Sequence, residues 1–176
     1  LNLDSEDEGE IFMGCAGGKD TQAEFYYDPL NTSPNLQYFI IDVRGLNGGH
    51  SGGEIHKGLG NANKILARFL YIMQQNFTLC SIDGGNLRNA IAREAHAIVG
   101  LYPEDKEKVR VMLNHFAADI ENELKHVDPN VLLTMKSVER PATRIDNERT
   151  QQLIYALQAC PHGVIGMSHD IEGLVE

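Results

Sequence analysis

The stretch LQYFIIDVRGLNGGHSGG, residues 36–53, decides the fold of this chain. Its first nine residues are rich in aromatic and β-branched side chains, which predicts a strand over residues 36–44. Five glycines among the next nine residues predict a loop over residues 45–53. Apolar residues then recur in steps of four and three, as on one face of a helix; they are Ile55, Leu59, Ala62, Leu66, Phe69 and Met73.

The elements that follow complete a regular order. Strands are predicted over residues 77–82, 94–101 and 131–139, and a helix opens at Pro103 and ends before Asp128-Pro129. The order is therefore β-α-β-β-α-β from residue 36 to residue 139, which is the split, ferredoxin-like arrangement of an α+β fold. An antiparallel sheet should carry both helices on one face. A C-terminal helix over residues 146–160, capped by Asp146, and flanking strands over residues 1–4, 11–13, 23–27, 164–168 and 171–175 are expected in addition.

Composition limits the partners. The 176 residues carry 15 Lys and Arg against 25 Asp and Glu, a formal net charge of −10, which argues against nucleic acid and anionic membranes as partners. The chain has no apolar run long enough to span a membrane. Three widely spaced cysteines favour a reducing, cytoplasmic compartment. Because the chain opens at Leu1 within an apparent strand, we expect it to be an excised piece of a longer polypeptide.

Three polar features stand out, and residue patterns alone leave each with two interpretations. His50 lies among glycines that would let another molecule approach, or it is a loop residue without chemistry. The loop is no phosphate loop, since no Lys-Ser/Thr follows, and His50 and His56 are too far apart for a zincin pair. Asp4 follows an apolar strand, either as a metal ligand or in a solvated acidic loop. Asn89 either binds substrate or belongs to a hairpin turn.

The motifs that contain these residues resemble a known family. Residues 1–12 read LNLDSEDEGEIF, residues 45–56 read GLNGGHSGGEIH, and GNAN follows at residues 60–63. They are similar to the aminoacyl-histidine dipeptidases, also called Xaa-His or cytosol non-specific dipeptidases. Residues 84–91, GGNLRNAI, fit the wider di-zinc metallopeptidase family that includes carnosinase. The resemblance covers nearly the whole chain.

The resemblance implies a role for each part of the chain. Residues 1–20 would end a segment of the catalytic domain, residues 21–163 would form the lid and dimerisation domain, and residues 164–176 would return to the catalytic domain. Asp4 would bind one of two zinc ions, with other divalent metals as alternatives. His50 would stabilise the oxyanion and can reach the neighbouring subunit's site in relatives, while Asn89 would help to hold a dipeptide such as Xaa-His.

The remaining metal ligands of that family would lie outside this sequence, so we expect the chain alone to be inactive. The expected assembly is a homodimer formed through the lid. Two alternatives stay open at this point. The chain could be a stand-alone ferredoxin-like binding or oligomerisation module without catalysis, or part of another di-zinc amidohydrolase that acts on N-acyl or ureido substrates. The other histidines, among them His96, show no pairing in the sequence and are interpreted as structural or surface residues.

Overall fold

The computed structural model describes residues 8–9, 17–73, 76–172 and 175. These ranges form the following elements: β1 (Leu30–Asn31), β2 (Gln37–Arg44), β3 (Gly49–His50), a 3-10 turn η1 (Ile55–Lys57), α1 (Ala62–Met73), β4 (Thr78–Gly84), β5 (Ala90–Ile91), β6 (Ala95–Leu101), a 3-10 turn η2 (Pro103–Asp105), α2 (Lys106–Leu124), β7 (Leu132–Ser137), β8 (Thr143–Arg144) and α3 (Asn147–Ala159). The strands predicted over residues 1–4 and 11–13 lie outside the described residues.

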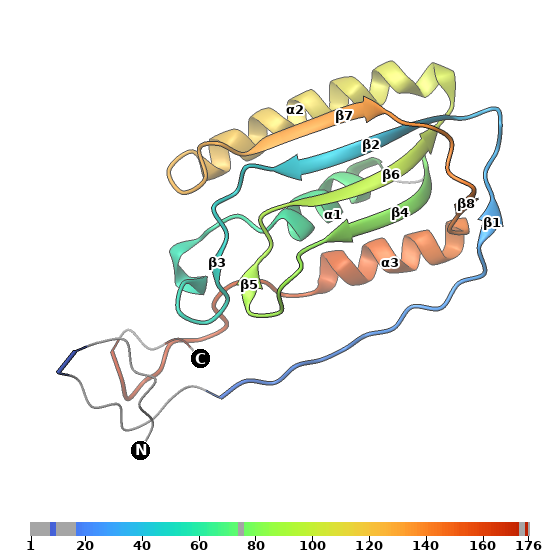
Figure 1. The fold of residues 1–176 in the computed structure, drawn as a ribbon. Coiled ribbons are helices and arrows are strands. Elements are labelled where there is room, and N and C mark those ends of the chain that lie inside the picture. The colour runs from blue at the N-terminus through green and yellow to red at the C-terminus, as the bar shows by residue number, and fades with distance from the viewer. Residues whose placement is uncertain (1–7, 10–16, 74–75, 173–174, 176) are drawn as a thin grey trace.

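The centre of the fold is a four-stranded antiparallel sheet with the order β4-β6-β2-β7. Strands β2 and β6 are adjacent in the middle, and each has one edge strand on its other side (Figure 1). The helices α1 and α2 connect β2 to β4 and β6 to β7. The predicted ferredoxin-like β-α-β-β-α-β order is confirmed.

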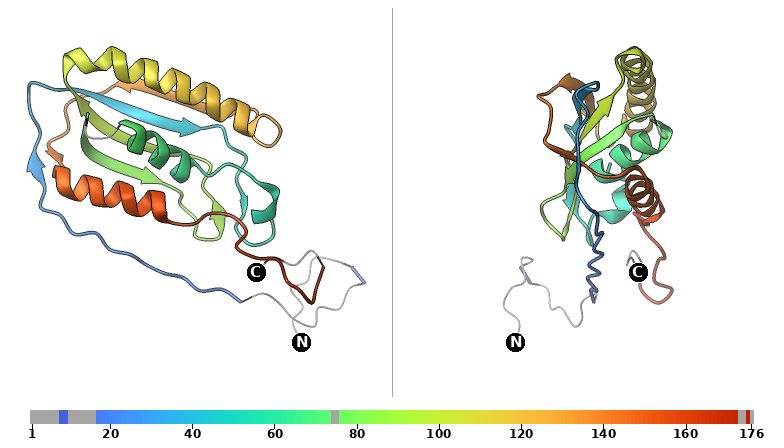
Figure 2. Two further views of the ribbon diagram at one scale, coloured as in Figure 1. Left: turned by 180° about the vertical axis from the view of Figure 1, so that it is seen from behind. Right: turned by 90° about the vertical axis from the view of Figure 1, so that its right-hand side faces the viewer.

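The helices lie together on one side of the sheet, as the edge-on view in Figure 2 shows. Their apolar sides and the inner face of the sheet form one core, in which Phe69 of α1 is fully buried and its ring centroid lies 5.4 Å from that of Phe116 of α2. Arg68 of α1 forms a two-pronged ion pair with Glu123 of α2, at 2.8 and 2.9 Å. The two helices are thus joined both inside and at the surface.

The third helix is attached to the first by a lysine. Lys64 of α1 donates to the backbone oxygens of Leu157, Gln158 and Cys160 at 2.7–2.8 Å. A cation at the C-terminal end of a helix satisfies carbonyl groups that have no partner within the helix. At the other end of α3, the predicted cap is confirmed, because the Asp146 side chain accepts from the backbone N–H of Arg149 at 2.9 Å.

Four predicted elements were wrong in detail. The helix expected from Ile55 begins only at Ala62, because the chain makes the short turn η1 and passes Gly58 in a left-handed conformation before α1 starts. Residues 23–27 are extended and exposed but form no strand, since none of the described residues pairs with their backbone. The two strands predicted at the C-terminal end are reduced to one antiparallel bridge between Met167 and Val175.

The two segments that flank the compact body lead to the same end of it. Residues 17–29 run past α3 and residues 161–172 continue beyond it, and both reach the end where β3 and β5 lie (Figures 1 and 2). None of the described helices has the length and apolar character needed to cross a membrane.

Candidate functional site

Two loops meet at the end of the sheet, in a small two-stranded pairing. Strand β3 lies in the loop between β2 and α1, and β5 lies in the loop between β4 and β6. They pair antiparallel, with His50 opposite Ala90, and the backbone N–H of Ser51 donates to the carbonyl of Asn89 at 3.0 Å. The structure therefore brings His50 and Asn89 onto neighbouring backbones, although they are 39 positions apart in the sequence.

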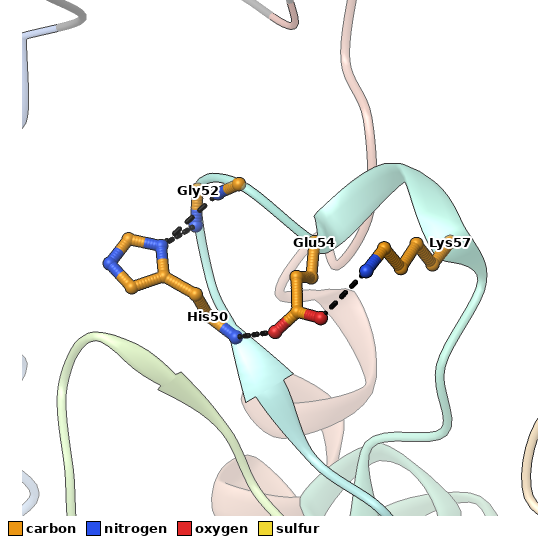
Figure 3. A network of polar contacts seen from close by, with 5 residues as sticks. His50, Gly52, Glu54 and Lys57 are labelled. Atoms are coloured by element: carbon orange, nitrogen blue, oxygen red, sulfur yellow. Dashed lines mark hydrogen bonds and ion pairs between the residues drawn. The ribbon is translucent and has the colours of Figure 1, made fainter. Parts of the chain in front are cut away.

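The imidazole of His50 is exposed and held by its own loop. Its Nδ1 accepts from the backbone N–H groups of Gly52 and Gly53, each at 3.1 Å (Figure 3). In a neutral imidazole one nitrogen accepts and the other carries the hydrogen. Two donors at Nδ1 therefore assign the Nε2–H tautomer to neutral His50. None of the described residues hydrogen-bonds to Nε2, which leaves this N–H available to a ligand.

The backbone of His50 is held by Glu54. Its Oε2 accepts from the His50 N–H at 2.8 Å, and its Oε1 accepts from the Lys57 ammonium at 2.8 Å (Figure 3). The hydrogen bond from Lys57, followed by that from the His50 backbone, lowers the pKa of the Glu54 carboxyl group. Glu54 thus stays ionised and keeps accepting at neutral pH. The loop is consequently ordered by polar contacts on both sides of the imidazole.

A cavity of about 450 Å³ lies between the two loops. Its lining includes three hydrogen-bonding side chains of the two loops, His50, Asn89 and Arg93, together with His96 of β6 and the carboxylates of Asp83 and Glu94. A second cavity, about 380 Å³ between α1 and α3, is lined by amides, aromatic rings and Thr150. None of the described residues around that second cavity carries a carboxylate, imidazole or cation, so we place the candidate site at the His50 cavity.

Arg93 is a pocket residue that sequence reasoning missed. Its aliphatic stem lies against Gly48, and a Cβ atom at position 48 would overlap the Arg93 Cγ atom. Its guanidinium forms no ion pair with any other residue of the described ranges. A guanidinium that forms no ion pair and lines a cavity is suited to bind a carboxylate through two parallel hydrogen bonds. The glycine at position 48 was the available signal, because it leaves room for a long side chain.

The motif GNAN at residues 60–63 has a structural role in the described fold. The Asn61 side-chain oxygen accepts from the backbone N–H groups of Asn63 and Lys64, at 3.0 and 3.3 Å, and so caps the start of α1. The Asn61 side-chain nitrogen donates to Nδ1 of His162 at 3.1 Å. Burial is the main reason that the pKa of His162 is lowered. His162 is therefore part of the scaffold behind the loop.

No metal centre can be built from the residues described. Within residues 8–9, 17–73, 76–172 and 175, no three His, Cys, Asp or Glu side chains come close enough together to hold a metal ion. Asp4, the metal ligand expected from the resemblance, lies outside the described residues. The site that the described part of the chain presents is thus a set of hydrogen-bond donors and one guanidinium, beside the carboxylates of Asp83 and Glu94.

Comparisons with known proteins agree with the resemblance drawn from the motifs. Residues 41–128 match the family of peptidase dimerisation domains. The whole chain is 39% identical to the cytosol non-specific dipeptidase of Escherichia coli (strain K12), and it spans 37% of the length of that relative. The fold is also similar to the crystal structure of aminoacylhistidine dipeptidase from Vibrio alginolyticus, with a TM-score of 0.80 and 35% sequence identity. The similar region covers 88% of this chain and 31% of the Vibrio chain.

Proposed function

Since the chain belongs to the family of peptidase dimerisation domains, we propose that it forms the lid and dimerisation part of a metal-dependent dipeptidase. The two relatives named above support this proposal, and both are dipeptidases by name. We propose residues 21–163 as the lid and residues 1–20 and 164–176 as connections to the catalytic domain. The convergence of residues 17–29 and 161–172 at the His50 end supports this division, because a catalytic domain attached there would face the cavity (Figure 1).

The observation that carries the proposal is the exposed Nε2–H of His50. The amides of Gly52 and Gly53 occupy Nδ1, so the ring presents a single donor in a fixed direction. Donors held in advance where negative charge develops stabilise the tetrahedral intermediate of peptide hydrolysis. We therefore assign to His50 the stabilisation of the oxyanion, and to Asn89, on the neighbouring backbone, a hydrogen bond to the substrate.

Arg93 is the group that we propose for the free carboxylate of the dipeptide. A dipeptidase must recognise a chain end next to the scissile bond, and Arg93 lines the same cavity as His50 and Asn89. Its position after β5 places it on the same loop as Asn89. Bidentate recognition by a guanidinium supplies both affinity and orientation. Dipeptides of the Xaa-His type are the proposed substrates.

Most ligands of the metal ions would come from the rest of the proposed enzyme, because the described residues do not form a metal site. When bound, two zinc ions would activate water and polarise the scissile carbonyl. We propose Asp4 as the ligand that this chain supplies, and expect the chain alone to hydrolyse no dipeptide. We also propose a cytoplasmic location, in keeping with the name of the E. coli relative.

The test compares the chain with the full-length protein. Both are assayed with a His-containing dipeptide and with an N-acyl amino acid, with zinc removed and then restored. The proposal expects zinc-dependent dipeptide hydrolysis by the full-length protein only. Turnover by the isolated chain contradicts its role as a lid, and preference for the N-acyl substrate assigns the protein to the amidohydrolases instead. A full-length protein without either activity supports a binding module.

A second experiment tests whether His50 acts in the partner's site. Full-length His50→Ala and Asp4→Ala proteins are mixed in equal amounts, dissociated and reassociated. If His50 reaches across a homodimer, each mixed dimer regains one complete site, and the mixture should recover about a quarter of the wild-type activity. No recovery, with mixed dimers demonstrated by native mass spectrometry, would show that His50 acts within its own subunit.

A further inference from the structure

Asp128 is a fully buried carboxylate between α2 and β7. Its Oδ1 accepts from the backbone N–H of Asn47 at 2.6 Å, and its Oδ2 accepts from the backbone N–H of Gly60 at 2.7 Å. These two amides lie on either side of His50, at the start and the end of the loop that carries it. One side chain from a distant part of the sequence thus joins both ends of the His50 loop.

An aspartate buried at position 128 would by itself lower the stability of the fold. A buried carboxylate is unfavourable unless charge or hydrogen bonds compensate it, and no described cation forms an ion pair with Asp128. Asp128 also lies four positions after Leu124, the last residue of α2, and donates its own N–H to the carbonyl of Leu124 at 2.8 Å. The C-terminal end of a helix disfavours negative charge. The two loop amides are therefore the groups that make this carboxylate tolerable.

The turn after α2, which contains Asp128, also holds the His50 loop by a second contact. The side-chain amide of Asn47 donates to the carbonyl of Val127 at 2.6 Å. Asn47 is consequently fixed through its backbone and its side chain, three positions before His50. The far end of the loop leads directly into α1, whose first residue, Ala62, donates to Ala92 at 2.9 Å. Both ends of the loop are thus tied to the body of the protein.

We propose that Asp128 is a positioning residue for His50. It closes the base of the loop over residues 47–60, so that the imidazole is presented in one orientation toward the cavity. This inference rests on the proposed function of His50 as the oxyanion donor. Asp128 itself does not touch the substrate, and acts through the loop. Small displacements of a catalytic donor lower the rate strongly, because the donor must lie within hydrogen-bond distance of the developing charge.

The first test is Asp128→Asn in the full-length protein. Asparagine has the same shape, but its NH₂ group would face one of the two N–H donors, so one end of the loop is released. We expect kcat to fall about 10- to 100-fold with little change in KM. The matched control is Asp146→Asn, the same substitution at another carboxylate that accepts a backbone N–H, here at the start of α3. Since Asn caps helices as well as Asp, kcat should not change.

A double-mutant cycle separates positioning from general stability. If Asp128 acts through His50, then Asp128→Asn should lower kcat no further in a His50→Ala background. Equal losses in both backgrounds would overturn the proposal. Should Asp128→Asn fail to fold, Asn47→Ala provides a milder change, because it removes only the bond to Val127. It should reduce kcat about 3-fold with the wild-type His50 and have no effect without it.

A second readout uses the full-length protein and needs no catalysis. Long-range ¹H–¹⁵N NMR spectra report the tautomer of each imidazole. We expect the Nε2–H pattern for neutral His50 in the wild-type protein, and a mixture of tautomers together with faster amide exchange at Asn47 and Gly60 in Asp128→Asn. Unchanged spectra would overturn the positioning role. If the spectra change while full-length His50→Ala keeps its kcat, the proposed function fails and the structural role of Asp128 stands.

Discussion

The substitution Gly45→Ala should destabilise the chain because Gly45 lies where the His50 loop leaves the sheet. Its φ angle is +81°, a left-handed conformation, and a Cβ atom there would overlap the carbonyl oxygen of Asn130 in the turn after α2. The left-handed conformation costs about 1–2 kcal/mol for alanine. Moving the loop away from Asn130 would also stretch the bond from Asn47 to Asp128, and a hydrogen bond to a charged group contributes about 1.5–3 kcal/mol. Together these losses amount to about 2.5–5 kcal/mol.

Gly58→Ala is the matched control for that measurement. Gly58 also has a left-handed φ, +68°, but no atom lies within 4 Å of a Cβ built on it. It should therefore show only the conformational loss of about 1–2 kcal/mol. Thermal unfolding followed by circular dichroism measures both variants, and for a chain of this size Tm should fall by about 10 °C in Gly45→Ala and about 4 °C in Gly58→Ala. Equal destabilisation of the two variants would refute the packing of the loop against the α2–β7 turn.

Other predictions concern the scaffold. Phe69→Ala should reduce the free energy of unfolding by about 3–5 kcal/mol, because Phe69 is fully buried against Phe116; a loss below about 1 kcal/mol in urea unfolding would contradict that packing. Burial raises the pKa of Cys80 to about 11, whereas Cys160 is exposed. Iodoacetamide at about pH 8 should therefore alkylate Cys160 far faster than Cys80, as followed by peptide mass spectrometry. Equal rates at the two cysteines would contradict the burial of Cys80. The folded state lowers the pKa of His162 from 6.5, so between the two pKa values the unfolded chain binds more protons than the folded chain. Protonation of His162 therefore does not destabilise the fold above about pH 6.5, and it lowers the free energy of unfolding as the pH falls below that value. The free energy of unfolding should therefore fall less on acidification in His162→Gln than in wild type. Identical dependence of this free energy on pH in the two proteins would contradict the lowered pKa of His162.

The sheet and its helices could be predicted because their signals are local. The aromatic and β-branched run of β2 and the apolar stripes of α1 and α2 each lie within one continuous segment. The start of α1 was misplaced because Ile55 and Leu59 continue the same stripe by coincidence. A strand over residues 23–27 was wrong for a different reason: an extended pattern predicts a conformation, while a strand also needs a partner for its backbone.

The candidate site was only partly predictable. The motifs indicated His50 and Asn89 separately, but their proximity depends on two strands of two residues each, which are too short to leave a pattern. Asp128 was interpreted only as the end of a helix, because Asp128-Pro129 is typical of one. Its contacts with Asn47 and Gly60 are 81 and 68 positions away and depend on how α2 packs.

The central claim, that the chain provides the oxyanion donor of a dipeptidase, is tested most directly by kcat of the full-length His50→Ala protein. The substitution leaves the backbone bond to Glu54 in place and removes only the imidazole. We predict that kcat falls about 10²- to 10³-fold with a correctly folded dimer, as for the loss of an oxyanion donor. A kcat equal to that of wild type would contradict the account.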